Sequence, residues 1–254
     1  MIDVHCHLEQ KDYNKDRETV INRCRKELKA VITSAARVKD FNLTLSLAEK
    51  YPNFVFVILG LHPADIKILD EKIISDSIDF ISLNKEKIAA VGEVGLDYHW
   101  IKEPEGREKQ KKLFMRMISL AKSISKPLLI HSREAGDDTL AILKEENAGR
   151  VLLHLFNSKE QIDQVVDNGW SISIGPSILK SKDIRKIARD MPLDRIMLET
   201  DSPWFGFGKR NTPLAIKQVA EKIAEIRSIT FEEVWKAAGA NAVKFFNLPL
   251  QIYS

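Results

Sequence analysis

The chain has 254 residues, of which 44% are hydrophobic and 30% are charged, and its formal net charge is +3. These proportions are those of an ordinary globular protein, and so slight a charge neither demands nor excludes a nucleic-acid partner. Only two cysteines occur, so no disulfide framework is implied. No apolar run is long enough to span a bilayer, and Met1 leads almost at once into the first predicted strand, leaving no room for a signal peptide. We therefore expect a cytoplasmic protein with no membrane partner.

Short β-branched and apolar runs alternate along the chain with longer amphipathic segments. The runs predict eight strands, at residues 2–5, 30–35, 54–60, 88–95, 127–132, 150–156, 170–175 and 195–201. Between them, apolar residues at three- and four-residue spacing predict helices that include residues 16–29, 106–124 and 158–168. We expect Ser158 to be the N-cap of the third of these helices, with Gln161 three residues on and Gly169 just past the helix end.

Apolar strands that are each followed by a helix indicate a parallel sheet covered on both faces. Eight such units in about 250 residues predict an α/β fold of the (β/α)₈ TIM-barrel type. A doubly wound open sheet is the main competitor, but it would more usually carry a Gly-rich phosphate turn after its first strand, where this chain has "HCHL". Helical patterns at 214–228 and 231–246, the second with Thr230 as its N-cap, close the chain with an extra C-terminal helix. We expect residues 1–254 to form one domain.

Two histidines, His5 and His7, stand one residue apart at the end of the first predicted strand. Side chains alternate between the faces of a strand, so His5 and His7 point the same way and Cys6 points the opposite way. Two imidazoles on one face can hold a single cation together. Two core histidines that bond to their neighbours would give the same pattern, and the pair alone leaves these two readings at about even odds.

Four other predicted strands carry a residue that can bind a metal at or near their carboxyl ends, which is where the reactive face of a parallel barrel lies. These residues are Glu93, His131, His154 and Asp201. His131 or His154 alone would more often be a polar residue with an ordinary hydrogen-bond partner. Together with His5 and His7, the two favour a metal site. Glu199 shares a face with Asp201, but we expect it to form a structural salt bridge, because Asp201 lies nearer the strand end.

Glycines flank Glu93 at positions 92 and 95 and allow close backbone approach, and a carboxylate at this place can bridge two cations. A mixed imidazole and carboxylate set suits Zn²⁺, Mn²⁺, Fe²⁺ or Ni²⁺ better than an all-oxygen Mg²⁺ or Ca²⁺ site. Two such cations activate a water molecule, which a carboxylate such as Asp201 can orient or deprotonate. The residues therefore predict metal-dependent hydrolysis, with Asp201 and Glu93 as the catalytic carboxylates.

The ordered motifs along the chain are "DVHCHL" (3–8), "GLHPAD" (60–65), "AVGEVGLDYHW" (90–100), "PLLIHSRE" (127–134), "LLHLFNS" (152–158), "PLDRIMLETDSPW" (192–204), "KRNTP" (209–213) and "NAVKFFNL" (241–248). In these motifs the chain resembles, nearly end to end, the TatD family of metal-dependent deoxyribonucleases within the amidohydrolase-like barrel superfamily.

The resemblance implies a site for two divalent cations, Mg²⁺, Mn²⁺ or Zn²⁺. It implies that His5, His7, Glu93 and Asp201 bind the first cation and that Glu93, His131 and His154 bind the second. It also implies a DNA substrate whose phosphodiester bonds are hydrolysed, often from the 3′ end. The ligand chemistry alone favours a softer metal than Mg²⁺.

One motif departs from the family pattern. The family usually has His-Cys-Phe-Ser-Gly where this chain reads "HLFNS", so the predicted ligand His154 is kept, whereas Leu155, Asn157 and Ser158 differ from the commonest form. The absence of a lysine at the fourth strand end, where Glu93 stands, argues against the carbamylated-lysine branch of the superfamily.

A phosphodiester substrate needs cations or N–H donors near the metals. We expect Arg133 to supply one, with a surface ion pair to Glu134 as the alternative. Lys209 and Arg210 lie in the loop after the eighth strand, a place that often binds phosphate in such barrels. His62 can donate to a phosphate oxygen, or hydrogen-bond to a metal ligand instead.

Two other functions remain open at the level of the sequence. The same metals can polarise a carbonyl, so an amide or ester hydrolase of the amidohydrolase, lactonase or aminoacyl-ester deacylase type is the alternative to a DNase. A non-catalytic metal barrel that binds a partner is the third. No obligate protein partner is evident, and the oligomeric state is open.

Overall fold

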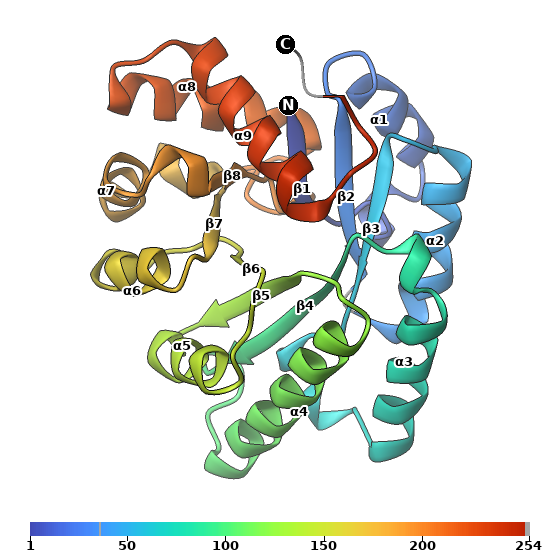
Figure 1. The fold of residues 1–254 in the computed structure, drawn as a ribbon. Coiled ribbons are helices and arrows are strands. Elements are labelled where there is room, and N and C mark those ends of the chain that lie inside the picture. The colour runs from blue at the N-terminus through green and yellow to red at the C-terminus, as the bar shows by residue number, and fades with distance from the viewer. Residues whose placement is uncertain (36, 252–254) are drawn as a thin grey trace.

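The computed structural model describes residues 1–35 and 37–251, and parallel strands lie at its centre. Each strand pairs with its neighbours in chain order, and helices surround the ring, so the fold is a TIM barrel, as predicted (Figure 1). The strands are β1 (Ile2–Cys6), β2 (Ala30–Ala35), β3 (Val55–Leu59), β4 (Ala90–Asp97), β5 (Leu128–Arg133), β6 (Val151–Leu153), β7 (Ser171–Ile174) and β8 (Ile196–Leu198).

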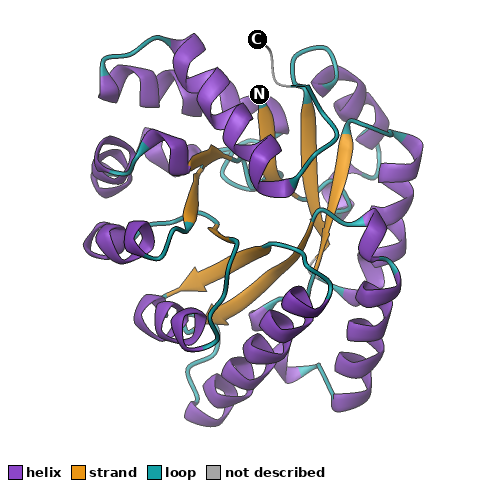
Figure 2. Cartoon of the chain, in the orientation of Figure 1, coloured by secondary structure: helices purple, strands orange, loops and turns teal. Residues whose placement is uncertain are grey.

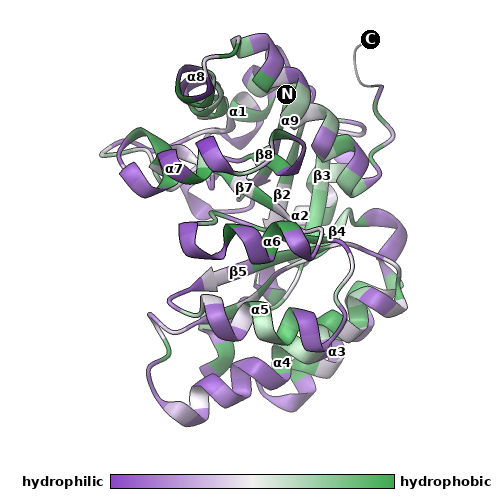
Figure 3. Cartoon of the chain, turned by 60° about the vertical axis from the view of Figure 1, so that its left-hand side comes forward, coloured by the Kyte–Doolittle hydropathy of each residue, from purple (hydrophilic) through white to green (hydrophobic). Residues whose placement is uncertain are grey.

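Helices form the outer layer of the barrel (Figure 2). They are α1 (Arg17–Cys24), α2 (Phe41–Lys50), α3 (Glu71–Leu83), α4 (Pro104–Ser123), α5 (Gly136–Glu145), α6 (Ile162–Asp167), α7 (Lys182–Asp190), α8 (Ile216–Arg227) and α9 (Phe231–Phe246). Figure 3 shows hydrophobic residues along the central strands and hydrophilic residues along the outer helices, the distribution expected for strands buried on both faces. The extra C-terminal helix is α9, which packs beside β1 and β8. Among the described residues, no helix combines the length and the apolar character needed to cross a membrane.

Hydrogen bonds close the barrel between β1 and the segment after β8. The amide of Asp201 donates to the carbonyl of His5 at 3.0 Å. The buried carboxylate of Asp3 accepts from the amide and from the hydroxyl of Thr200, at 3.0 and 2.5 Å. Burial raises the pKa of Asp3 well above its usual value, although the bonds from Thr200 act in the opposite direction. This closure brings the first and the last predicted metal ligands side by side.

The carboxyl ends of three strands differ from the prediction by more than one residue. β6 ends at Leu153 and β8 at Leu198, so His154 and Asp201 lie on the segments that follow them, whereas β4 continues as far as Asp97. Just past these short strands the backbone turns into the left-handed region, with φ +45° at Leu155 and +49° at Asp201. The apolar runs extend beyond the ladders because the segments that follow the strands are also largely buried.

The two predicted N-caps have different outcomes. The Thr230 hydroxyl accepts from the amide of Glu233 at 3.1 Å, and the Glu233 carboxylate accepts from the amide of Thr230 at 2.7 Å, so this cap is confirmed. Ser158 precedes a short 3₁₀ turn and makes no side-chain cap bond. Gln161, its expected partner, donates instead to Asp137 of α5 at 2.7 Å. The side-chain cap predicted at Ser158 is wrong, because the amide of Gln161 donates to the Ser158 carbonyl at 3.2 Å and the Gln161 side chain is engaged by a tertiary contact.

The glycines around Glu93 allow the close backbone approach that was predicted. A Cβ on Gly95, whose φ is +140°, would lie 2.1 Å from the carbonyl oxygen of His131. A Cβ on Gly92 would lie 2.8 Å from the Cβ of Leu129. β4 and β5 therefore lie close together, which brings Glu93 next to His131.

Candidate metal centre

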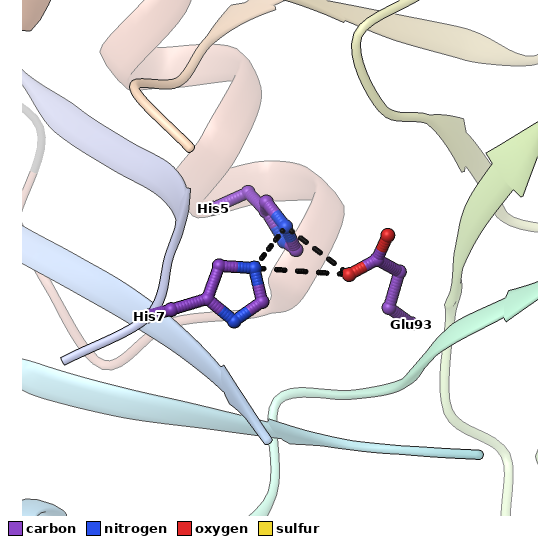
Figure 4. A group of neighbouring side chains, drawn as sticks. All are labelled: His5, His7 and Glu93. Atoms are coloured by element: carbon purple, nitrogen blue, oxygen red, sulfur yellow. Dashed lines mark hydrogen bonds and ion pairs between the residues drawn. The ribbon is translucent and has the colours of Figure 1, made fainter. Parts of the chain in front are cut away.

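The six predicted ligands converge at the carboxyl ends of the strands. They come from β1, β4 and β5 and from the segments that follow β1, β6 and β8: His5, His7, Glu93, His131, His154 and Asp201. All except His131 are buried, and its side chain is only 14% exposed. Figure 4 shows His5 and His7 pointing from one side toward the carboxylate of Glu93.

His5 and His7 form a first group with Asp201. Their Nε2 atoms lie 3.0 Å apart, and the Oδ1 atom of Asp201 lies 3.4 Å from the first and 3.2 Å from the second. The Oε2 atom of Glu93 is 3.5 Å from His5 Nε2 and 3.8 Å from His7 Nε2. The expectation that His5 and His7 share a face is confirmed, and Cys6 turns away to donate from its thiol to the carbonyl of Ile32.

His131 and His154 form a second group around the other oxygen of Glu93. The Oε1 atom of Glu93 lies 2.7 Å from His131 Nδ1 and 2.9 Å from His154 Nε2, and these two nitrogens are 3.2 Å apart. Each oxygen of one carboxylate thus faces a different pair of imidazoles. This is the arrangement expected of a carboxylate that bridges two cations.

Hydrogen-bond acceptors on the outer sides of His7 and His131 indicate which nitrogen of each ring carries the proton. The Nδ1 atom of His7 lies 2.8 Å from the Ser34 carbonyl, and the Nε2 atom of His131 lies 2.9 Å from Asp97 Oδ2. The Nδ1 atom of His154 lies 3.4 Å from Glu199 Oε2 without forming a hydrogen bond to it. In His7 and His131, an N–H directed at the acceptor leaves the opposite nitrogen of the ring with its lone pair toward the centre. These lone pairs are what a metal ion requires.

The charged groups of the centre lower the pKa values of its carboxylates and raise those of its imidazoles. Burial would raise the pKa of Asp201 and of Glu93, but the imidazoles beside them hold both values below the usual carboxyl range. Burial would lower the pKa of His7 and of His154, but the nearby carboxylates, Glu9 for the first and Glu93 for the second, raise both well above 6.5. Without a cation, the rings therefore hold protons that a bound metal would displace.

His62 lies beside the second group, but its hydrogen bonds differ from those of the other rings. Its Nδ1 atom accepts from the amide of Ala64 at 3.1 Å, so the proton of the neutral ring is on Nε2. That Nε2–H faces Glu93 Oε1 at 3.3 Å. The geometry makes His62 a hydrogen-bond donor at the edge of the centre, the type of contact that the sequence predicted for it.

The donor set fits two divalent cations. The imidazole nitrogens that face one another lie 3.0 Å apart in the first group and 3.2 Å apart in the second, so one cation can use the lone pairs of both nitrogens in each group. Mixed imidazole and carboxylate donors suit Zn²⁺, Mn²⁺ and similar ions. The buried histidine and glutamate clusters are thus suited to a binuclear site, and they do not single out one metal.

The centre opens into a cavity of about 820 Å³. Among the described residues that line it, the arginines are Arg37 and Arg133 and there is no lysine. Arg133 makes no ion pair with Glu134, which instead pairs with His99 at 2.7 Å. The guanidinium of Arg133 lies over the exposed ring of Trp100, 5.8 Å from its centroid. Arg133 is therefore available to an anionic ligand in the cavity.

Lys209 and Arg210 are not among the residues that line this cavity. Arg210 forms a two-pronged ion pair with Asp16, at 2.8 and 2.5 Å, and lies over the ring of Tyr13. Both of its partners belong to the segment after β1, far away in the sequence. That these two cations contact a substrate stays a prediction, and such a contact would lie outside the cavity.

Sequence reasoning missed Glu9, Asp97 and Arg37 as residues of this site. Glu9 lies 3.2 Å from His7 Nδ1, and Asp97 accepts from His131. The sequence did contain a signal for Asp97. Side chains alternate along a strand, so residues 93, 95 and 97 of β4 share a face, and Asp97 could have been predicted to lie on the same face as Glu93. Arg37 stands two residues after the end of β2, at the same rim as the ligands.

Comparisons with known proteins agree with this geometry. The family model of TatD-related DNases matches residues 2–247. Human deoxyribonuclease TATDN3 is 35% identical over 97% of this chain and 94% of its own length. The metal-dependent hydrolase YabD of Bacillus subtilis is 34% identical, over 98% of this chain and 99% of its own length. The crystal structure of YJJV, a TatD homologue from Escherichia coli, superposes with a TM-score of 0.88 at 28% identity and covers 98% of both chains. The chain therefore belongs to the TatD family of metal-dependent hydrolases.

Proposed function

We propose that this protein is a divalent-metal-dependent deoxyribonuclease that hydrolyses phosphodiester bonds of DNA. The observation that carries the proposal is the arrangement of Glu93, whose two oxygens face two separate imidazole pairs at the base of a cavity lined by arginine. Binuclear sites of this kind stabilise both the attacking and the leaving oxygen of a displacement at phosphorus. The human relative that is named a deoxyribonuclease supports the choice of DNA as the substrate.

The proposed ligands follow from the two groups. His5, His7, Glu93 and Asp201 would hold the first cation, and Glu93, His131 and His154 would hold the second. When bound, the two cations would polarise the phosphoryl oxygens and acidify a water molecule near neutral pH.

Other roles fall to the side chains themselves. Asp201 reaches the cavity with 11% of its side chain exposed, and one of its oxygens can orient the attacking water and accept its proton. His62 directs Nε2–H toward the centre and can donate to a phosphate oxygen. Arg133 provides a guanidinium for the same phosphate or the next one.

A nuclease assay across several metals tests the proposal. Purified protein with added Mg²⁺, Mn²⁺ or Zn²⁺ should degrade DNA that carries a label at the 3′ or at the 5′ end, in single- and double-stranded form. A His154→Ala variant that remains folded should lose this activity. Hydrolysis of esters or amides by a protein that leaves every DNA substrate intact would instead establish the amide or ester hydrolase alternative.

A further inference from the structure

Arg37 occupies a distinct position in the cavity wall. It follows β2, whereas Arg133 ends β5, so the two arginines approach the centre from strands that are three places apart in the barrel order. Both line the cavity that contains the candidate ligands. The centre is thus flanked by two guanidinium groups, one on the side of β2 and one on the side of β5.

Hydrogen bonds hold the guanidinium of Arg37 in place. Its Nε atom donates to Asp40 Oδ2 at 3.0 Å, and its Nη2 atom donates to Gln10 Oε1 at 2.9 Å. Within residues 1–35 and 37–251, its Nη1 atom has no hydrogen-bond partner. The side chain is thus ordered, while two N–H donors of Nη1 remain free for a ligand.

Gln10 connects this arginine to the metal centre. Its Nε2 atom donates to Glu9 Oε1 at 2.9 Å, and the same oxygen of Glu9 lies 3.2 Å from His7 Nδ1. Gln10 itself lines the cavity. The chain of contacts from Arg37 through Gln10 and Glu9 to His7 fixes the arginine relative to the first group of ligands.

A simple surface ion pair between Arg37 and Asp40 explains less of this geometry. Such pairs contribute little to stability, and the Asp40 contact alone requires neither the bond to Gln10 nor a place in the cavity wall. A DNA strand of three or more nucleotides, by contrast, presents at least one further anionic phosphate beside the one that reacts, even when the reacting bond is the terminal one. A guanidinium that is already fixed in position before binding is well suited to such a phosphate, because little side-chain conformational freedom is lost on binding.

We propose that Arg37, held by Gln10, binds the phosphate next to the one that is hydrolysed. The inference rests on the proposed nuclease function and adds a subsite to it. The subsite recognises a strand that continues past the reacting bond on the side of β2. It would give the enzyme a preference for oligonucleotides over esters that contain a single phosphate.

The test compares two substrates that differ in their number of phosphates. A short oligonucleotide contains neighbouring phosphates, whereas bis(4-nitrophenyl) phosphate contains only the reacting one. Arg37→Gln should lower kcat/KM on the oligonucleotide about tenfold, mainly through KM, and leave the single-phosphate ester within about twofold of the wild type. Arg189→Gln changes an exposed arginine of α7 that pairs with Asp190, and this matched control should alter neither value.

Direct binding gives a second readout, independent of turnover. Fluorescence anisotropy with a labelled oligonucleotide should show weaker binding by Arg37→Gln and a salt dependence whose slope falls by about 1. Gln10→Ala keeps the charge but removes the tether, and its loss of oligonucleotide binding should be smaller than that of Arg37→Gln. Equal losses on both substrates would overturn the proposal, because Arg37 would then act through the metal centre. Unchanged oligonucleotide binding would overturn it too. If the wild type hydrolyses neither substrate, the nuclease proposal fails, and the anisotropy still decides whether Arg37 binds the strand.

Discussion

Asp97 and His131 form a hydrogen bond at the edge of the metal centre, in which the ring Nε2–H donates to the carboxylate Oδ2 at 2.9 Å. The bond leaves Nδ1 of His131 facing Glu93. Asp97→Asn weakens this acceptor, so we expect metal affinity to fall about 10–100-fold while the fold is kept. Titration with Co²⁺ followed by absorption measures the change. Asp76→Asn, which removes a surface partner of Lys72 on α3, is the matched control. Equal affinity in both variants would mean that Asp97 has no part in metal binding.

The two groups of ligands should be separable by mutation. His131→Ala removes a proposed ligand from the second group only, and Asp201→Asn alters the first group only. Each variant should keep the wild-type circular dichroism, bind less metal per chain, and lose more than about 100-fold in kcat, since even outer-sphere partners cost 10–100-fold. Mass spectrometry of the bound metals measures the stoichiometry. Wild-type metal content in either variant would remove that residue from the proposed ligand set.

Metal binding should depend on pH in a defined direction. The carboxylates around His7, His131 and His154 outweigh their burial and raise their pKa values above 6.5 in the absence of metal. A cation must displace these protons, so apparent affinity should continue to rise with pH above 6.5 and level off only beyond the raised pKa values. Calorimetry in buffers of different ionisation enthalpy would also detect the released protons. An affinity that stays flat above pH 6.5 would show that the rings are already neutral.

Barrel closure should be sensitive to Asp3. This buried carboxylate accepts from the amide and the hydroxyl of Thr200. Asp3→Ala leaves both donors unpaired, and each unpaired buried donor costs about 1–3 kcal/mol, so the free energy of unfolding should fall by about 3 kcal/mol or more. Thr200→Val removes only the hydroxyl, and we expect a smaller loss of about 1–2 kcal/mol. Urea denaturation measures both variants, and the reverse order would contradict the role assigned to Asp3.

Two glycines offer a test of the close approach between β4 and β5. A Cβ at position 95 would lie 2.1 Å from the carbonyl oxygen of His131, whereas a Cβ at Gly149 would meet no atom within 4 Å. Gly95→Ala should therefore lower the free energy of unfolding by about 3 kcal/mol or prevent folding, as expected for strain and overpacking combined. Gly149→Ala should leave stability unchanged or raise it by up to about 1 kcal/mol. Thermal unfolding of the Gly95→Ala and Gly149→Ala variants measures this difference in stability.

The sequence predicted the fold and the set of convergent residues for one physical reason. Strands buried on both faces must be apolar, so a polar residue such as Glu93 or His131 at the end of one is conspicuous against its neighbours. The barrel rule then places every such end at one rim. Only these two local facts were needed to group six residues from distant parts of the chain.

The tertiary structure alone decided the contacts of long, flexible side chains. Arg210 has a partner in Asp16, 194 positions away, and Arg37 is held by Gln10, 27 positions away. A guanidinium on a rotatable stem reaches several neighbours, and periodicity carries no information about which of them it meets. The sequence therefore singled out Arg210 as a phosphate contact and passed over Arg37. The backbone fixes the proposed ligands at the carboxyl ends of the strands, whereas the arginine and lysine side chains around them are positioned by packing between segments that meet only when the barrel closes.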